Sequence, residues 1–572
     1  MWVVLDDAQG GLAFKEPLRL IRADRIEEVP AALAAMEAAR AGGRWLAGWF
    51  AYELGYALEK RLERLMPAGG PLLSFGVFDA PCQGRPQTSG RAYAGPLRPE
   101  WDVDAYGNAF RAAKEYIEAG DIYQANLSFR ASFNFAGDPY ALYEKLRHAS
   151  AAPHCAYIAE SDRQILSLSP ELFFELTADG ALTARPMKGT VGRDAGGAAL
   201  AASPKDRAEN LMIVDLIRND LGRIAEVGSV AVRDLFAVET YPTLHTMVST
   251  VKAQLKPDGT IAAILGALFP CGSVTGAPKI RAMEILRELE ASPRRAYCGA
   301  IGHFAPDGSA RFNVAIRTLT LAEGRGQLGI GGGVVQDSKA QSEYAECLLK
   351  ARFYEAARRP LDLIETLRFE SDFVRLDSHL ARMAGSASLF GLAFDARAAR
   401  QALADCVAGR VGPLRVRLSL DEAGVHRASA APLAPNPLNW RYAISDRRVH
   451  SGDLLLRHKT SWRDLYEAEA ARHATDEVIF LNERDELAEG ARSNIFIRCG
   501  ERLLTPPLAS GVLDGRLRAE LIAQGRCDEA VLTEADLALA DLKGEVWLGN
   551  SLRGLIPAVR VPDQPALAAS AE

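Results

Sequence analysis

The stretch Asp206-Arg-Ala-Glu-Asn-Leu-Met-Ile-Val-Asp-Leu-Ile-Arg-Asn-Asp-Leu-Gly-Arg223 carries the clearest helix pattern of the chain and anchors the fold of its first half. Ser203 is a good N-cap, and Pro204 suits the first helical position. Apolar residues recur on one face before Gly222 ends the run: Leu211, Val214, Ile217 and Leu221. We therefore expect a helix here, with Glu209 in its early turns.

A second helix is predicted from near Ser338 towards Arg358. It places Glu343, Glu346 and Lys350 at i, i+3 and i+7, which is one helix face. Two carboxylates and an ammonium would then line up. For any single carboxylate of this kind, a solvated surface position is the commoner explanation.

Short apolar runs bounded by turn residues surround these helices and predict strands. The mixture favours an α+β fold over a regular βαβ repeat. The runs lie at residues 72–78, 155–158, 172–176, 230–232, 248–255 and 327–330, and residues 80–99 read as a loop.

Length and composition limit the function classes. With 572 residues, of which 48% are apolar and 24% charged, the chain has the composition of a globular protein of more than one domain. The net charge of −6 offers no electrostatic surface for nucleic acid or anionic lipid, so neither is expected as a partner.

Export signals and membrane spans are not expected either. Asp6 and Asp7 interrupt the short apolar run at the amino terminus before a signal core could form. The longest uncharged stretch, Gly259 to Pro278, is interrupted by glycines and prolines and is interpreted as a buried helix running into a loop. Scattered cysteines without zinc-ligand spacing favour a reducing cytoplasm.

A domain boundary is predicted near residue 360, where a basic pair and Pro360 end a helix and the strand-like run Leu363 to Phe369 begins. We expect three segments: residues 1–100 as the amino-terminal part of a first domain, 101–358 as its catalytic part, and 361–572 as a second domain.

Six motifs follow one another through the first half, and their joint order resembles the chorismate-utilising enzymes over roughly residues 100 to 355. The resemblance implies an anthranilate-synthase-like domain of antiparallel sheets with helices. The motifs are Gly120-Asp-Ile-Tyr-Gln-Ala-Asn-Leu-Ser128, Ser169-Pro-Glu171, Pro186-Met-Lys-Gly-Thr190, the 206–223 stretch, Gly272-Ser-Val-Thr-Gly-Ala-Pro-Lys279 and Ile316-Arg-Thr318.

Lys188 separates the branches of that family. Similar anthranilate synthases place Ala in the corresponding Pro-x-x-Gly-Thr motif, so the chain looks most like the aminodeoxychorismate synthase component I branch. An enzyme amine that first adds to the ring would split replacement of a ring hydroxyl by ammonia into two easier displacements. That lysine must be neutral, so its pKa must be lowered by burial or by nearby cations. Outside its motif, a lone lysine would be read as a solvated loop residue.

The resemblance also implies roles for the remaining site residues. Lys188 would attack chorismate while Glu171 protonates the departing hydroxyl. Glu209 and Glu346, with Glu343 behind them, would bind Mg²⁺, which prefers oxygen ligands. A guanidinium suits a bidentate carboxylate, and glycine-rich turns offer backbone amides to anions. The implied substrate-binding residues are Thr275, Gly276, Arg317, Gly331, Gly332, Gly333 and Lys350.

The segment after residue 360 resembles the class IV pyridoxal-phosphate enzymes, which implies an α/β fold of two subdomains. The family holds aminotransferases and aminodeoxychorismate lyase. The motifs are Glu365-Thr-Leu-Arg368, His379-Leu-Ala-Arg-Met383, His458-Lys-Thr-Ser461, Glu489-Gly-Ala-Arg-Ser-Asn-Ile-Phe496, Gly511-Val-Leu-Asp-Gly-Arg516 and Gly549-Asn-Ser-Leu-Arg-Gly554.

This chemistry needs an amine that holds the cofactor and moves a proton, an acid for the pyridine nitrogen, and donors for the phosphate. Lys459, Glu489 and Arg382 match those roles, and the backbone near Leu513 and the Asn550 to Ser551 turn would add phosphate donors. Taken singly, Arg382 would be a helix surface charge and Glu489 a loop acid.

Together the halves predict an enzyme that makes 4-aminobenzoate, a folate precursor, from chorismate and ammonia. Two alternatives stay open at the level of activity: an amino-acid aminotransferase as the second half, or an anthranilate synthase-type first half. A third is a catalytically silent scaffold module. No glutaminase motif is visible, so a separate glutamine amidotransferase subunit is the expected partner, and similar class IV enzymes are commonly dimers.

Overall fold

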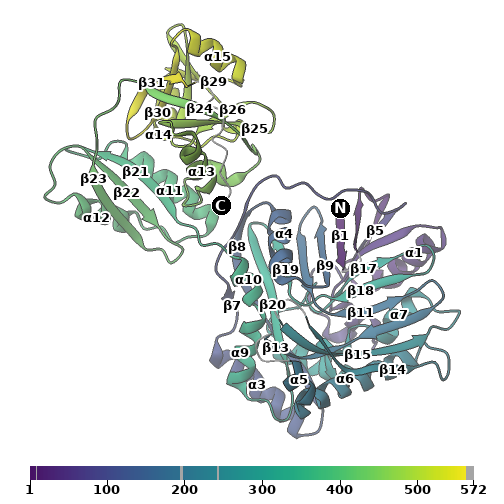
Figure 1. Ribbon diagram of the computed structural model, residues 1–572. Helices are drawn as coiled ribbons and strands as arrows, with labels where there is room; N and C mark the ends of the chain where they lie inside the picture. Colours follow the sequence, from purple (N-terminus) through teal and green to yellow (C-terminus); the bar gives the residue numbers. More distant parts are fainter. Residues whose placement is uncertain (8–9, 193–196, 241–243, 562–572) are drawn as a thin grey trace. The chain divides into compact units, whose positions relative to one another are not determined.

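The computed structural model describes residues 1–7, 10–192, 197–240 and 244–561, and the chain folds into two compact units (Figure 1). The first unit holds residues 1–86, 97–133 and 143–357. The second holds residues 87–96, 134–142 and the chain from Arg358 onward. Two short segments of the first half therefore fold with the second half.

One sheet of the first unit carries the glycine-rich strand of the candidate site. Its hydrogen-bonded order is β16-β8-β20-β19-β10-β9-β1-β2, and β7 pairs with β8. The bounds are β1 (Trp2–Asp7), β2 (Gly10–Lys15), β7 (Arg98–Pro99), β8 (Gln124–Gly137), β9 (His154–Ala159), β10 (Gln164–Ser169), β16 (Gly276–Ala277), β19 (Thr318–Ala322) and β20 (Arg325–Val334).

The other sheet of this unit carries Lys188 on β13, and its strand β11 begins just after Glu171. Its order is β13-β15-β12-β11-β18-β17-β4-β5-β3, and β14 also pairs with β15. The bounds are β3 (Arg19–Ala23), β4 (Trp45–Phe50), β5 (Leu73–Phe78), β11 (Leu172–Leu176), β12 (Ala181–Arg185), β13 (Met187–Gly192), β14 (Ala231–Thr240), β15 (Leu244–Gln254), β17 (Ala300–Phe304) and β18 (Ala310–Val314).

Helices of the first unit cover these sheets and close the core. They are α1 (Val29–Ala41), α2 (Leu54–Leu58), α3 (Val103–Glu118), α5 (Gly197–Ala202), α6 (Pro204–Gly222), α7 (Ile261–Leu268), α8 (Lys279–Leu289), α9 (Ala340–Lys350) and α10 (Arg352–Ala357), with 3-10 turns η1 (Ile26–Glu28), η2 (Glu63–Leu65) and η4 (Gly272–Val274). Helix α4 (Pro139–Ser150) begins in residues of the second unit and continues into the first. No helix among the described residues is long and apolar enough to cross a membrane.

The helix predicted after Ser203 is confirmed as α6, and the Ser203 side chain accepts a hydrogen bond from the Asp206 amide as an N-cap. Its buried face contains Val214, Ile217 and Leu221, but Leu211 is 45% exposed, because Ile213 takes the place next to the core. The helix predicted from Ser338 to Arg358 is wrong as one element, since it breaks at Ala351 into α9 and α10. The loop predicted over residues 80–99 contains two short strands, β6 (Ala92–Ala94) and β7.

The second unit begins with a small three-stranded sheet. The strands β21 (Leu363–Phe369), β22 (Leu414–Leu420) and β23 (His426–Pro432) are antiparallel and pack with α11 (Leu376–Phe390) and α12 (Ala396–Val407). The early segments complete its core, because β6 pairs with the end of β8 and Tyr93 is fully buried beside Phe390 and Trp462. Arg91 donates to the Asp453 carboxylate (2.7 Å) and to the Trp462 carbonyl (3.2 Å).

A larger mixed sheet completes the second unit, in the order β26-β25-β24-β31-β30-β27-β28-β29. Its strands are β24 (Trp440–Val449), β25 (Glu477–Asn482), β26 (Leu487–Gly490), β27 (Asn494–Cys499), β28 (Arg502–Thr505), β29 (Cys527–Glu529), β30 (Val546–Asn550) and β31 (Gly554–Arg560). The helices are α13 (Asp464–His473), α14 (Arg516–Ala523) and α15 (Glu534–Leu542), with 3-10 turns η5 (Leu454–Arg457) and η6 (Leu508–Ser510).

Candidate active sites

Lys188 lies on β13, opposite Met247 of β15, with its amine half-buried. Its Nζ makes no hydrogen bond to any described residue and lies 3.5 Å from where a Cβ on Gly333 would stand. Burial lowers the pKa of Lys188, with Lys350 adding to that effect while Glu209, Glu171 and Glu346 oppose it. The structure therefore brings this amine together with the glycine-rich strand, and a lowered pKa is what a nucleophilic amine requires.

Glu171 directly precedes β11 and is 4% exposed. The Ser273 hydroxyl donates to its Oε1 (2.7 Å), and the backbone N–H of Glu171 donates to Ser169 Oγ (3.1 Å). Burial raises the pKa of Glu171 to about 7, although the Ser273 hydrogen bond and the Lys188 charge act in the opposite direction. A carboxyl group with this pKa can hold a proton and release it near neutral pH, as a general acid must.

The glycines at 331–333 bring the backbone of β20 close to polar side chains. A Cβ on Gly331 would lie 2.6 Å from the Leu127 carbonyl oxygen, and one on Gly333 would lie 2.8 Å from Gln124 Nε2. The Lys350 amine donates to the Gly331 carbonyl (3.0 Å) and pairs with Glu346 (3.0 Å). A side chain at 333 would therefore occupy the space beside Lys188, and one at 331 would collide with the neighbouring strand β8.

Arg317 follows β18 and has φ of 50°, a backbone conformation that non-glycine residues rarely adopt. Burial lowers the pKa of its guanidinium, and its side chain has no hydrogen-bond or ionic partner among the described residues. A guanidinium stays charged, and a half-buried unpaired cation is unfavourable unless an anion joins it. The strained residue thus presents an open site for a carboxylate.

Thr275 and Gly276 shape the neighbouring loop. Thr275 is fully buried, and its hydroxyl donates to the carbonyls of Cys271 (3.2 Å) and Gly272 (3.1 Å). Gly276 has φ of 155° and pairs with Ala125 of β8, so closely that a Cβ there would collide with the Gln124 carbonyl. The Thr275 hydroxyl is thus engaged within the loop, and backbone groups are what this turn offers a substrate.

The three predicted metal ligands are not gathered into one cluster. Glu343 is buried and accepts from Ser338 Oγ (2.7 Å), whereas Glu346 pairs with Lys350. Across the described part of the chain, no three His, Cys, Asp or Glu residues lie close enough to hold a metal ion. Glu209 and Glu346 both act on the Lys188 charge, so two carboxylates lie near this amine. Mg²⁺ is commonly held by one or two carboxylates together with oxygen atoms of substrate and water. The residues present fit Mg²⁺ only in an arrangement of that kind.

Gln124 is a residue to which sequence reasoning assigned no role. It is fully buried on β8, and both its amide oxygen and its amide nitrogen lack a hydrogen-bond partner. Buried amides are nearly always paired, so this one is poised for a ligand. Its place inside the first motif was the only signal in the sequence, and the motif alone does not say which of its polar residues faces the site.

Lys459 lies just after η5, where its backbone carbonyl accepts from the Ile364 N–H (2.9 Å) of β21. Its amine makes no hydrogen bond to a described residue. Burial lowers the pKa of Lys459 to about 8, with Arg382 and Arg463 adding to the effect and Glu365 and Glu489 opposing it. A substantial fraction of this amine is therefore neutral near physiological pH.

Glu489 lies on β26 and is 6% exposed. It accepts from the Tyr466 hydroxyl (2.7 Å) through one oxygen and from the Leu513 amide (2.8 Å) through the other. Burial raises the pKa of Glu489 to about 7. The Leu513 amide, predicted as a phosphate donor, is occupied by this carboxylate.

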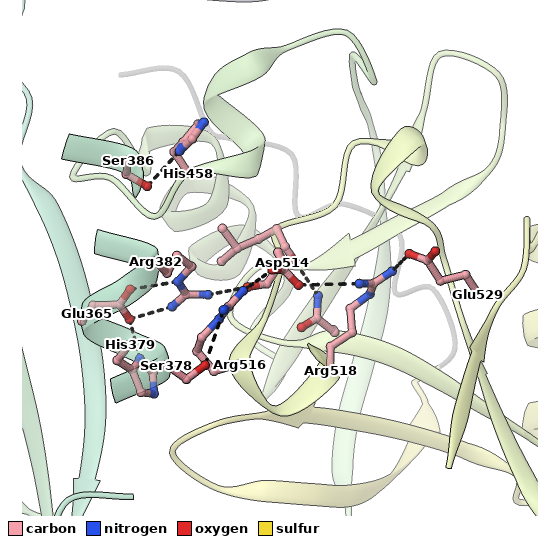
Figure 2. A network of polar contacts seen from close by, with 12 residues as sticks. Glu365, Ser378, His379, Arg382, Ser386, His458, Asp514, Arg516, Arg518 and Glu529 are labelled. Carbon is pink, nitrogen blue, oxygen red and sulfur yellow. Dashed lines mark hydrogen bonds and ion pairs between the residues drawn. The ribbon is translucent and has the colours of Figure 1, made fainter. Parts of the chain in front are cut away.

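Arg382 lies on α11 at the centre of a polar network, which Figure 2 shows. Its guanidinium donates to both oxygens of Glu365 (2.8 and 2.6 Å) and to the Asp514 carbonyl (2.7 Å), leaving two of its five N–H groups for an anion. His379 contacts Glu365 (2.6 Å) and Ser551 (2.8 Å). Although burial acts to raise it, the pKa of Glu365 falls to about 2 because Arg382 and His379 surround it.

The Asn550 to Ser551 turn follows β30. The Asn550 side chain accepts from the backbone amides of Leu552 (3.1 Å) and Arg553 (3.0 Å) and donates to the Arg492 carbonyl, so it fixes the turn. The Ser551 hydroxyl contacts His379, which joins this turn to the Arg382 network. In the sequence, Glu365 and His379 were only members of motifs, with no role assigned. In the structure, Glu365 holds the Arg382 guanidinium and His379 contacts Glu365.

These groups fit pyridoxal phosphate. A partly neutral amine without a partner, a buried carboxyl group with a raised pKa, and a guanidinium with spare donors lie on three different elements of one unit. The charges of both Arg382 and Glu489 act on the pKa of Lys459, so both groups lie within electrostatic range of this amine. They match the amine, acid and anion donor that the cofactor needs.

Comparison with known proteins gives a family match for each half of the chain. Residues 83–356 match the model of the chorismate binding enzyme family, and residues 362–561 match that of the class IV amino-transferases. The chain is a fusion of these two families. The recognition made from the motifs is thereby confirmed.

Named relatives cover the two segments separately. Aminodeoxychorismate synthase component 1 of Klebsiella aerogenes is 47% identical over 250 residues, which are 42% of this chain and 55% of that protein. The chain thus spans about half the length of the curated relatives it matches. A solved structure from Mesorhizobium loti, whose name is that of an amino-acid aminotransferase, is 41% identical over 35% of this chain and all of that chain, with a TM-score of 0.34.

The fold of the first unit has a solved counterpart. Anthranilate synthase component I from Streptococcus pneumoniae is 26% identical, covers 62% of this chain and 92% of that chain, and has a TM-score of 0.52. This likeness and the class IV match confirm the predicted fold class, with antiparallel sheets and helices in the first half and an α/β unit in the second.

Proposed function

We propose that the fused chain makes 4-aminobenzoate in two steps, amination of chorismate to aminodeoxychorismate followed by release of pyruvate. The observation that carries the proposal is the pair of lysines with lowered pKa, one in each unit, each beside a buried glutamate whose pKa is raised to about 7. Two amine–acid pairs on one chain match two successive steps on one metabolite.

In the first step, the neutral Lys188 amine attacks ring carbon C2 of chorismate while the C4 hydroxyl departs. Glu171 donates the proton that makes this hydroxyl leave as water, and ammonia then adds at C4 as the Lys188 nitrogen departs. Arg317 binds the pyruvyl carboxylate, because its guanidinium is half-buried and has no other partner in the described chain. The Gly333 backbone and the unpaired Gln124 amide lie beside Lys188 and would contact the bound ring.

Two further elements belong to the proposal for this step. Glu209 and Glu346 would hold Mg²⁺ against the ring carboxylate, with Lys350 and Glu343 positioning Glu346 and its helix. Ammonia would come from a separate glutamine amidotransferase subunit, as the name component 1 of the relatives suggests.

In the second step, bound pyridoxal phosphate supplies an electron sink that makes the C–H beside the substrate amine acidic. Lys459 would hold the cofactor and remove the proton from C4. The C3–O bond would then break as the ring becomes aromatic, and the departing enolpyruvate would take up a proton to give pyruvate. Glu489 would keep the pyridine nitrogen protonated, and the spare N–H groups of Arg382 would bind the phosphate. A dimer through this unit stays a prediction.

An aminotransferase would use the same lysine and the same acid, so the second activity must be tested by its product. The purified chain receives chorismate, Mg²⁺ and ammonium, with and without pyridoxal phosphate. We expect 4-aminobenzoate and pyruvate when the cofactor is present, and aminodeoxychorismate when it is absent. Accumulation of aminodeoxychorismate in the presence of cofactor would support the aminotransferase, and no turnover with the amidotransferase supplied would support a silent module.

Two lysine variants test which unit performs which step. Lys188→Ala should stop amination but leave cleavage of supplied aminodeoxychorismate intact, and Lys459→Ala should do the reverse. If either substitution abolished both steps in a folded protein, the assignment of one step to each unit would be wrong.

A further inference from the structure

A cavity of about 240 Å³ lies in the first unit, away from Lys188 and bordered by residues of both sheets. We call it the arginine cavity, because Arg130, Arg163, Arg294 and Arg295 line it. Its volume corresponds to roughly eight water molecules at about 30 Å³ each. A ligand that fills it is therefore small.

No Asp or Glu lines this cavity, and its four cations are unequally compensated. Arg294 pairs with Glu290 (2.5 Å), and Arg163 pairs with Asp162 (2.5 Å) and with Glu160 (3.7 Å). Within the described ranges, Arg130 and Arg295 form no ion pair. Arg130 donates to the Pro293 carbonyl, and Arg295 donates to the carbonyls of Gly69 and Ala68. Carbonyl groups satisfy donors without neutralising their charge.

The surrounding carboxylates are already engaged. Glu53 accepts from the backbone amides of Arg294 (2.7 Å) and Arg295 (3.0 Å), and Glu160 accepts from the Trp49 indole (3.1 Å). Arg163 Nε is buried and has no hydrogen bond, and burial lowers the pKa of both Arg130 and Arg295. Glu53 acts on the charges of both Arg130 and Arg295, and Glu100 acts on that of Arg130, but neither carboxylate lines the cavity. Half-buried cations that share a space lined by no carboxylate are costly, and an anion in that space would lower the cost.

The remaining lining combines aromatic and aliphatic side chains with the threonines Thr318 and Thr320. The Trp49 and Tyr297 rings are 1% and 9% exposed, and Ile165 lies beside them. Gln327, on β20, adds an exposed neutral amide to the lining. We propose that the arginine cavity binds a small planar carboxylate of the benzoate class, with its carboxylate among Arg130, Arg163 and Arg295 and its ring against the aromatic wall.

Residues of the cavity contact the neighbours of candidate synthase-site residues. The Arg294 guanidinium donates to the Val274 carbonyl (2.6 Å), next to Thr275, and to the Asn126 carbonyl (2.6 Å), on the strand of Gln124. Thr318, which lines the cavity, directly follows Arg317. A carboxylate bound to Arg295, the residue next to Arg294, would therefore act through Arg294 on the loop and strand that hold the substrate. This coupling rests on the proposed function, whereas the binding itself does not.

Calorimetric titration of the full chain tests the binding with three probes: benzoate, aniline and inorganic phosphate. Benzoate should bind saturably and more tightly than aniline, which lacks the charge, or phosphate, which lacks the ring. Loss of a hydrogen bond to a charged partner should weaken benzoate about tenfold in Arg130→Gln. The exposed Arg61→Gln is the matched charge control and should bind like the parent chain.

Two variants of the exposed Gln327 keep the test independent of folding. Gln327→Glu should weaken benzoate binding and Gln327→Lys should strengthen it, because they change the charge at the cavity wall with opposite sign. Arg317→Gln should leave cavity binding in place, which separates it from occupation of the synthase site.

The proposal is overturned if benzoate does not bind, if phosphate or aniline binds as tightly, or if the Gln327 pair has no opposite effect. It is also overturned if only Arg317→Gln removes binding. Failure of the chain to make 4-aminobenzoate would refute the proposed function instead, since these titrations use no turnover.

Discussion

Ser273→Ala offers a sharp test of the role of Glu171, because it removes one hydrogen bond from one catalytic carboxyl group. The Ser273 hydroxyl donates to Glu171 Oε1 (2.7 Å) and favours the ionised form of that group. Its loss should therefore raise the pKa of Glu171. If Glu171 must be protonated to expel the hydroxyl, amination falls as pH rises through the pKa of Glu171, about 7 in the parent chain.

The size of the shift follows from the strength of the bond. Hydrogen bonds to charged groups contribute about 1.5–3 kcal/mol, and one pKa unit corresponds to about 1.4 kcal/mol. The alkaline limb should therefore move upward by about one to two units. As a result, Ser273→Ala should keep a larger fraction of its maximal rate at pH 8 than the parent chain keeps.

The assay is the rate of chorismate amination from pH 6 to 9.5 at a constant concentration of neutral ammonia. Ser169→Ala is the matched control, because its hydroxyl donates to the Val314 carbonyl (2.5 Å) and accepts from the Glu171 amide without contacting the carboxylate. This control should be less stable but keep its limb near pH 7. A limb in Ser273→Ala that stays in place or moves to lower pH would refute the reasoning.

Three further outcomes are expected. Gln124→Leu removes an unpaired buried amide, so the temperature of thermal unfolding should stay unchanged or rise. The KM for chorismate should rise about tenfold. A marked loss of stability would show that the amide is structural. Glu365→Gln leaves Arg382 without its buried counter-ion and should destabilise the second unit by about 3–5 kcal/mol, as urea unfolding would measure. Because its pKa is lowered to about 2, Glu365 contributes stability that is present above pH 4.5 and lost as pH falls towards 2. Glu365→Gln should lack that decline in stability. An equal decline in both chains would contradict the ion pair. Arg91→Ala should lower the stability of the second unit and weaken its cofactor binding but leave amination unchanged. Replacement of the exposed Arg98 by Ala should change none of these properties. Loss of amination in Arg91→Ala would contradict the unit assignment.

Local rules predicted the elements whose signals lie within a few residues. The cap at Ser203, the helix α6 after it and the strand β21 all follow from neighbouring side chains. Leu211 shows the limit of such rules, since helical periodicity alone does not say which edge of an apolar stripe meets the core. The break between α9 and α10 at Ala351 could not be predicted, because no proline or glycine accompanies it.

Long-range assembly was beyond these rules. The sequence contains no signal that Arg91 and Tyr93 would pack beside Asp453 and Trp462, more than 350 residues later, because those contacts depend on the tertiary fold. The motifs likewise identified Lys188 and Arg382, but not the residues that shift the pKa of Lys188 or hold Arg382 in place. Ser273, Gln124 and Glu365 emerged only once burial and hydrogen bonding were known.

The most direct measurement concerns the covalent step at Lys188. The full chain is incubated with chorismate and Mg²⁺ without any ammonia source, quenched with acid, digested and examined by peptide mass spectrometry. The peptide containing Lys188 should gain the mass of chorismate less one water, and Glu171→Gln should slow its appearance. An unmodified Lys188 in a chain that makes aminodeoxychorismate once ammonium is added would contradict the account.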